Sequence, residues 1–264
     1  MFVLPRSNAI ERESTFKTNI MIKVDKLSKI YRNNLVLDSI TFMVEEGTSI
    51  AIIGRNGSGK SSLLKSMLDM VKFDQGDIFY DEFKKERYLS SKIKKQIGAF
   101  LGDNILIEEL SGLDFLSFIA DIYGVDNFKQ RIDYLRGIFL FEDSKKFNSE
   151  SISTYSLGMK RKISLMSALI HTPKYIILDE PFAGLDFIVI KQIFEYLLEL
   201  KNKNRAHLIF STHILSHVQY LADNLLLLES GRLMFYGKVS SVDLSYIEEH
   251  LNSEEENTLL ISKN

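Results

Sequence analysis

Gly54-Arg55-Asn56-Gly57-Ser58-Gly59-Lys60-Ser61 fits the pattern GxxxxGK[ST], in which a glycine-rich loop joins a buried strand to a helix. The apolar run 49–53 precedes this stretch, and a helix-forming run that opens at Ser62 follows it. The glycines let backbone N–H groups turn toward phosphate oxygens, and the helix N-terminus adds a favourable dipole. A glycine-rich turn with an incidental lysine is the alternative, which the four fixed positions and both flanks disfavour. We therefore expect this loop to bind a nucleoside triphosphate.

Two side chains of the loop have specific expected roles. Lys60 is expected to reach the β- and γ-phosphates, where its charge assists both binding and turnover. The Ser61 hydroxyl is expected to take one position on a Mg²⁺ ion that bridges the phosphates.

Carboxylates follow another apolar strand, because the run 175–178 ends in Asp179 and Glu180. Ligands of parallel α/β sheets lie at the carboxyl ends of strands, so we expect both residues beside the phosphate loop. Mg²⁺ needs only one or two carboxylates and otherwise keeps water, and we assign Asp179 to it. Glu180 is expected to act as general base or to orient the attacking water. The alternative is that Asp179 and Glu180 are only surface acids at the end of a strand. The presence of the phosphate loop disfavours that interpretation.

Two further segments are candidates for the site. Ser211-Thr212-His213 ends the next predicted strand, 208–210, and a histidine there could contact the γ-phosphate and the attacking water. Lone histidines are usually structural, but this position favours a functional role. The segment 155–162 opens a predicted helix that runs to about residue 170. Ser156 is a natural N-cap, and Gly158 exposes N–H groups at the positive end of the helix dipole.

The order of apolar runs predicts an α/β fold: a P-loop NTPase core with a mostly parallel sheet, an antiparallel β subdomain near the N-terminus and an inserted α-helical subdomain. The ranges 22–31 and 38–44 alternate like half-buried strands around a turn at 32–34, and 76–80 is another short strand. Helical periodicity runs from 110 to about 170. Beyond it, short strands alternate with helices, at 175–178, 187–200, 207–211, 214–221 and 225–228.

Composition excludes several classes of function. The chain has 264 residues, 45% of them hydrophobic and 26% charged, as in ordinary globular proteins. Its net charge of −2 gives no global attraction to nucleic acid, and we interpret the basic stretch 84–95 as a solvated surface. Without cysteine there is no disulfide, thiol catalysis or thiolate metal site. No apolar run approaches the ~20 residues that span a bilayer, and residues 1–19 lack the apolar centre of a secretory signal.

With these segments in this order, the sequence resembles the nucleotide-binding subunit of ATP-binding cassette (ABC) transporters from about residue 22 to 237. A phosphate loop alone is shared by many NTPases. The helix opening at Ser156, shortly upstream of Ile177-Leu178-Asp179-Glu180-Pro181, is far more specific. So is Phe182-Ala183-Gly184-Leu185-Asp186, which is similar to the family's D-loop.

The resemblance implies roles for five residues beyond the loop. Tyr31 lies where the family stacks an aromatic ring on adenine. Ser156 and Gly158 are similar to the signature residues that contact the γ-phosphate held by the other subunit. Asp186 matches the aspartate that couples the two composite sites, and His213 matches the switch histidine. By this resemblance two cassettes close around two ATP molecules, and hydrolysis lets them separate.

Two positions depart from the family's usual pattern. The signature reads Tyr-Ser-Leu-Gly-Met at 155–159, not Leu-Ser-Gly-Gly-Gln, and this form resembles a branch that pairs with separately encoded export permeases. The family usually has a glutamine after the strand 97–101, where it contacts Mg²⁺ and the transmembrane partner. Gly102 stands there in this chain, followed by Asp103 and Asn104. Either a neighbour substitutes for the missing amide, or coupling and turnover are altered.

The resemblance also implies cofactors, partners and a location. We expect ATP and Mg²⁺, a second cassette subunit in a homodimer or heterodimer, and a separately encoded integral-membrane permease, with no nucleic acid. The expected location is the cytoplasm, peripheral on the inner face of the cell membrane. The expected organisation is an N-terminal extension at 1–20, an ATPase domain at 21–240 with its helical subdomain at about 104–170, and a tail at 241–264.

Two other functions stay open on the sequence alone. One is a soluble cassette ATPase that acts on ribosomes, DNA or an assembly pathway. Such relatives usually carry two cassettes, a long coiled coil or a basic surface, none of which is evident here. The other is a regulatory cassette with weak hydrolysis, which Gly102 favours and the presence of Lys60, Asp179, Glu180 and His213 opposes.

Overall fold

The computed structural model describes residues 20–80, 89–102, 106–249 and 251. The expected extension at 1–20 therefore lies almost entirely outside the described residues, as do Asp103, Asn104, part of the basic stretch 84–95 and the acidic end of the tail. Within the described part, no helix is long and apolar enough to span a membrane.

Two sheets form the body of the molecule. The smaller sheet is antiparallel, with strand order β2-β1-β4. Its strands are β1 (Ile20–Tyr31), β2 (Asn34–Glu45) and β4 (Gln75–Tyr80). The larger sheet has the order β5-β6-β7-β3-β8-β9, and all its pairings are parallel except that of β8 with β9. Its strands are β3 (Ser49–Ile53), β5 (Ile97–Phe100), β6 (Tyr175–Leu178), β7 (His207–Ser211), β8 (Asn224–Glu229) and β9 (Arg232–Lys238).

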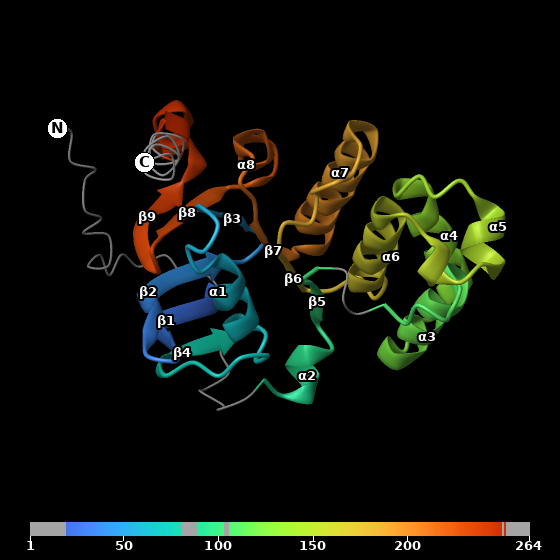
Figure 1. Cartoon of the computed structure of the whole chain (residues 1–264), viewed down its shortest axis with the longest axis horizontal. Coiled ribbons are helices and arrows are strands. Elements are labelled where there is room, and N and C mark those ends of the chain that lie inside the picture. The colour runs from blue at the N-terminus through green and yellow to red at the C-terminus, as the bar shows by residue number, and fades with distance from the viewer. Residues whose placement is uncertain (1–19, 81–88, 103–105, 250, 252–264) are drawn as a thin grey trace, which may run out of the picture.

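Helices lie beside the larger sheet and at one end of the molecule, where α3, α4 and α5 form a lobe far from the antiparallel sheet (Figure 1). The α-helices are α1 (Lys60–Met67), α2 (Ser91–Lys94), α3 (Gly112–Tyr123), α4 (Phe128–Ile138), α5 (Ser144–Ser149), α6 (Leu157–Leu169), α7 (Phe187–Asn204) and α8 (Leu215–Leu221). The described residues also form two 3₁₀ helices, η1 (Ile152–Thr154) and η2 (Val239–Ser241). The predicted fold class, with its antiparallel subdomain and inserted helices, is confirmed.

The structure differs from the predicted strands at two hairpins. The second strand begins at Asn34, not near residue 38, because Arg32 and Asn33 alone make the turn. Both have positive φ, 44° and 71°, as a two-residue turn of type I′ requires. The strand β9 was not predicted, and it returns antiparallel to β8 after a turn at Ser230 and Gly231.

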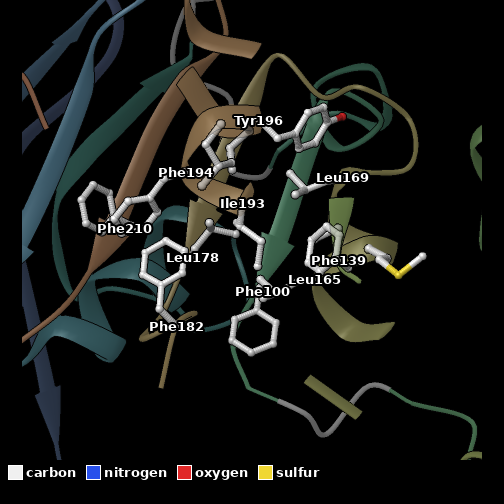
Figure 2. Packing of buried hydrophobic residues seen from close by; sticks show 14 of the residues in the cluster. Phe100, Phe139, Leu165, Leu169, Leu178, Phe182, Ile193, Phe194, Tyr196 and Phe210 are labelled. Atoms are coloured by element: carbon white, nitrogen blue, oxygen red, sulfur yellow. The ribbon is translucent and has the colours of Figure 1, made fainter. Parts of the chain in front are cut away.

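The larger sheet is buried on both faces, so the core has two parts. On β3, Ile50 and Ile52 face the cluster shared with α1 and the antiparallel sheet, while Ala51 and Ile53 face the helical side. Residues that alternate between two buried faces read as a continuous apolar run, which is why β3 shows no polar alternation. Figure 2 shows the helical side, where side chains of β6, β7, α6 and α7 interlock, among them Leu178, Phe210, Leu165 and Ile193.

Polar contacts attach the helical lobe to this core. Arg131 on α4 donates to the carbonyls of Leu169 and Ile170 at the end of α6 and also bonds the Tyr196 hydroxyl on α7. His171 stacks on Tyr123 of α3, with ring centroids 3.7 Å apart, and its Nε2 lies 3.1 Å from the Ile97 carbonyl on β5. Arg131 thus links α4 to the end of α6 and to α7, and His171 links α3 to the sheet.

His171 makes the stability of the fold depend on pH. Burial lowers its pKa from 6.5 to about 4, and its buried Nδ1 has no hydrogen-bond partner among the described residues. The unfolded chain therefore takes up a proton near pH 6.5, while the folded chain does so only near pH 4. We expect the free energy of unfolding to fall by on the order of 2 kcal/mol as the pH drops through this window.

Chemical denaturation between pH 7 and pH 4 measures this effect. The variant His171→Phe keeps an aromatic ring for Tyr123 but cannot titrate, so its stability should change less over the window than that of the parent chain. Identical pH slopes for the two proteins would show that His171 is not the group responsible.

Candidate functional site

A cavity of about 440 Å³ opens at the carboxyl ends of β3, β5 and β6. This is the edge of a parallel sheet at which ligands bind, and the volume suits a small organic ligand. Its lining combines the glycine loop, the end of β5, the end of β6 and one side chain of α6. The lining residues are Val36, Asn56, Gly57, Gly59, Lys60, Ser61, Ser62, Leu101, Gly102, Arg161, Asp179 and Glu180.

The loop 54–61 is built to receive an anion. Gly59 ends it at φ 107°, and a Cβ there would lie 2.9 Å from the Val36 carbonyl oxygen, so glycine is required. Gly59 is also the N-cap of α1 and makes no side-chain cap. The buried Ser58 hydroxyl has no hydrogen-bond partner within the described ranges. Phosphate oxygens could satisfy such donors at a helix N-terminus.

Lys60, the first residue of α1, folds back onto its own loop. Its Nζ donates to the carbonyl oxygens of Gly54 at 2.6 Å and Arg55 at 3.0 Å. Burial lowers the pKa of Lys60, and the negative charges of Glu180 and Asp179 partly oppose this shift. A triphosphate would add further negative charge beside this ammonium and so favour its charged form.

Hydrogen bonds hold the two carboxylates at the end of β6. The Ser211 hydroxyl donates to Asp179 Oδ1 at 2.5 Å and accepts from the Glu180 amide at 2.8 Å. The Asp179 amide donates to the Phe100 carbonyl at 2.7 Å. Glu180 has φ 46°, a left-handed conformation that is uncommon outside glycine and is often found at functional sites. Sequence reasoning missed Ser211, although its place at the end of a strand, two residues before His213, could have indicated it.

His213 contacts Glu180 directly. Its Nδ1 lies 3.1 Å from Glu180 Oε2, and 63% of the histidine side chain is exposed. The structure therefore brings together the loop, both carboxylates and the histidine that were predicted from separate segments of the chain. The contact also gives the Glu180 carboxylate a partner that can share or relay a proton.

Four predicted residues that lie outside the loop and do not contact Glu180 do not line the cavity. Ser156 is the exposed N-cap of α6 and accepts from the Met159 amide at 3.3 Å, as predicted. Asp186 is likewise the exposed N-cap of α7. A Cβ on Gly158 would lie 3.5 Å from the Gly184 carbonyl oxygen, so the two helix starts are neighbours. Tyr31, 39% exposed at the end of β1, has Lys29 Nζ 4.7 Å from its ring centroid.

The described ranges contain no group of three or more acidic or histidine residues that could hold a metal ion. Mg²⁺ bound mainly through substrate phosphates and water needs no such cluster. Ser61 and Asp179, the residues predicted to hold the ion, both line the cavity and carry side-chain oxygens.

Comparison with known proteins bears directly on this site. A family model described as ABC transporter matches residues 37–183. This range contains the glycine loop and both carboxylates. The ABC transporter ATP-binding protein NatA of Bacillus subtilis is 30% identical over 216 residues, which cover 81% of this chain and 86% of that protein. The lantibiotic transport ATP-binding protein SrtF of Streptococcus pyogenes is also 30% identical, with 81% and 89% covered.

A solved structure supports the same assignment. An ATP-binding subunit of an ABC transporter superposes with a TM-score of 0.78 at 28% identity, covering 88% of this chain and 99% of that chain. The family match extends over the glycine loop, the helical lobe and the carboxylate strand. On these grounds the chain belongs to the ABC transporter family, as an ATP-binding subunit.

Proposed function

We propose that this chain hydrolyses ATP in the cavity at the end of β3, β5 and β6, and that hydrolysis drives transport through a membrane permease. One observation carries the proposal: the phosphate-loop residues Lys60 and Ser61 share a cavity with Asp179 and Glu180, and His213 contacts Glu180. These groups come from three separate strand ends, and phosphoryl transfer needs this combination of a cation, a metal-binding carboxylate and a base.

The proposed chemistry assigns one task to each group. Lys60 leaves the Gly54 and Arg55 carbonyls and binds the β- and γ-phosphates. Glu180 accepts a proton from the attacking water, and His213 holds the Glu180 carboxylate in position through its Nδ1. Ser61 and Asp179 would hold Mg²⁺, which supplies charge neutralisation on the phosphates, and Ser211 fixes Asp179 for this purpose. The remaining loop residues, from Gly54 to Ser62, bind phosphate through backbone N–H groups, and Tyr31 stacks on the base.

The signature and D-loop residues act on a second cassette in this proposal. Ser156, Gly158 and Asp186 are at or near the surface and do not line the chain's own cavity. Closure of two subunits would bring the N-terminus of each α6 to the γ-phosphate in the opposite cavity, where its dipole stabilises negative charge. Whether the second cassette is a copy of this chain or a relative does not affect this geometry.

The transporter is proposed to be an exporter with a separately encoded permease. The Ser-Leu-Gly-Met form of the signature resembles that branch, and relatives include a protein named for lantibiotic transport. We place the subunit in the cytoplasm, peripheral on the inner face of the cell membrane. The ATPase domain is proposed to extend over 21–240, with the helical subdomain at about 104–170, an extension at 1–20 and a tail at 241–264.

Replacing the proposed base tests the chemistry. Glu180→Gln keeps the size of the side chain but cannot accept the proton, so the rate of ATP hydrolysis should fall roughly 10²- to 10⁴-fold. Equilibrium binding of ATP should stay close to that of the parent chain, and the closed dimer should accumulate with ATP. A variant that hydrolyses ATP at the parental rate would show that Glu180 is not the base.

Mixing two inactive variants tests whether the site is shared between subunits. Lys60→Ala removes the cation and should weaken ATP binding about 10- to 100-fold, since a charged hydrogen bond contributes about 1.5–3 kcal/mol. Gly158→Asp puts a negative charge at the start of α6, where the opposite γ-phosphate would lie. A mixed dimer contains one intact composite site, so the mixture should hydrolyse ATP faster than either variant alone. No gain on mixing, with both variants folded, would contradict a shared site.

The partner can be tested with the membrane protein encoded beside this chain. Co-expression should yield a complex in detergent, and reconstituted vesicles should hydrolyse ATP faster with the permease than the free subunit does. Stimulation by RNA or DNA, without association with any membrane protein, would instead support the alternative of a soluble cassette ATPase.

A further inference from the structure

Arg161 is a second cation in the nucleotide cavity, and it comes from the signature helix. It lies one turn after Gly158 on α6, and its side chain lines the same cavity as Lys60, Asp179 and Glu180. Its guanidinium donates through Nη1 to the Ala183 carbonyl, and Cζ lies 5.6 Å from the centroid of the Phe100 ring. One side chain therefore touches the cavity, the end of β5 and the loop 181–186 that leads into Asp186.

A glycine, Gly102, lines the same cavity as Arg161. Phe100 ends β5, and Leu101 and Gly102 continue the wall from there. Gly102 has φ 101°, and a Cβ built on it would meet no atom of the described chain within 4 Å. Gly102 itself adds no side chain to the cavity, whereas Arg161, which lines the same cavity, adds a guanidinium.

We propose that Arg161 is a positioning residue that links the nucleotide in the chain's own cavity to the loop 181–186 and so to the signature end of α6. The proposal rests on the proposed ATPase function. A guanidinium carries five donors in a planar fork, so it can hold the Ala183 carbonyl and an anion in the cavity together. The triphosphate would attract the guanidinium, and the loop would follow through its hydrogen bond. Because Gly184 of this loop lies against Gly158, the movement would reach the start of α6.

Two substitutions distinguish the role of the planar guanidinium donors from the role of the positive charge of Arg161. Arg161→Met keeps much of the length and the apolar stem but removes both charge and donors. Arg161→Lys keeps a charge and a donor for Ala183 but cannot bridge two acceptors in one plane. The neighbouring residue offers a matched control, because Lys162 on the same helix donates to the Leu140 carbonyl in the helical lobe, not to the cavity. Lys162→Met should leave ATP hydrolysis unchanged.

The kinetic test compares kcat with KM. Lys60 and the loop still bind the phosphates in the Arg161 variants, so KM should stay within about threefold, whereas kcat should fall about tenfold or more for Arg161→Met. Arg161→Lys should recover part of kcat. Equal kcat for Arg161→Met, Lys162→Met and the parent chain would overturn the proposal, as would a loss that appears only in KM.

A second readout does not depend on hydrolysis. Hydrogen–deuterium exchange of a peptide covering 181–187 should be faster in nucleotide-free Arg161→Met than in the parent and in Lys162→Met, and the protection that ATP adds there should be smaller. Unchanged exchange in both states would overturn the proposal. If Arg161→Met fails to fold, Arg161→Lys carries the same comparison.

The two readouts distinguish this proposal from the function on which it rests. If Glu180→Gln abolishes hydrolysis while the Arg161 variants behave like the parent, the ATPase assignment holds and the role of Arg161 is refuted. If the parent chain does not hydrolyse ATP but exchange at 181–187 still depends on Arg161 and on bound ATP, the link is real and the enzymatic assignment fails.

Discussion

The parallel pairing of β3, β7 and β6 is the constraint on which the site depends. β7 pairs with β3 on one side and with β6 on the other, so all three strands end at the same edge of the sheet. The glycine loop follows one of these ends, the two carboxylates follow another, and His213 follows the third. Burial of the sheet on both faces holds this order, because a slipped strand would expose apolar side chains and lose its ladder of hydrogen bonds.

Electrostatics explains why this edge is suited to a triphosphate and not to a hydrophobic ligand. The cavity holds Lys60 and Arg161 opposite Asp179 and Glu180, so its charges are nearly balanced before a ligand enters. Lys60 is satisfied in the meantime by two loop carbonyls, and Asp179 by the Ser211 hydroxyl. These contacts keep buried charges hydrogen-bonded, which is the condition under which such groups are tolerated. A triphosphate with its counter-ion can replace these hydrogen bonds, so that each carboxylate still has a partner.

The helical lobe adds what the sheet edge lacks. The helix that follows the lobe, α6, starts at the surface with Ser156 and Gly158, and it reaches the cavity one turn later through Arg161. His171, just after α6, contacts the Ile97 carbonyl on β5, and Arg131 of the lobe contacts the same end of α6, so the helix is held in a defined place relative to the sheet. In the proposed function, such a chain would present half of one reaction centre in its cavity and half of another on its surface.

Local sequence patterns by themselves determined much of this protein. The glycine loop, the carboxylate strand, the Ser156 cap and most strands of the sheet follow from spacing and periodicity over a few residues, because hydrophobic periodicity, turn residues and capping residues are local signals. Only the tertiary structure decided the rest. Ser211 meets Asp179 across 32 positions of sequence, and Arg161 meets Ala183 across 22. The strand β9 has no signal of its own beyond its hairpin with β8. Such contacts depend on how strands and helices are placed in space, and no local preference of the chain encodes that placement.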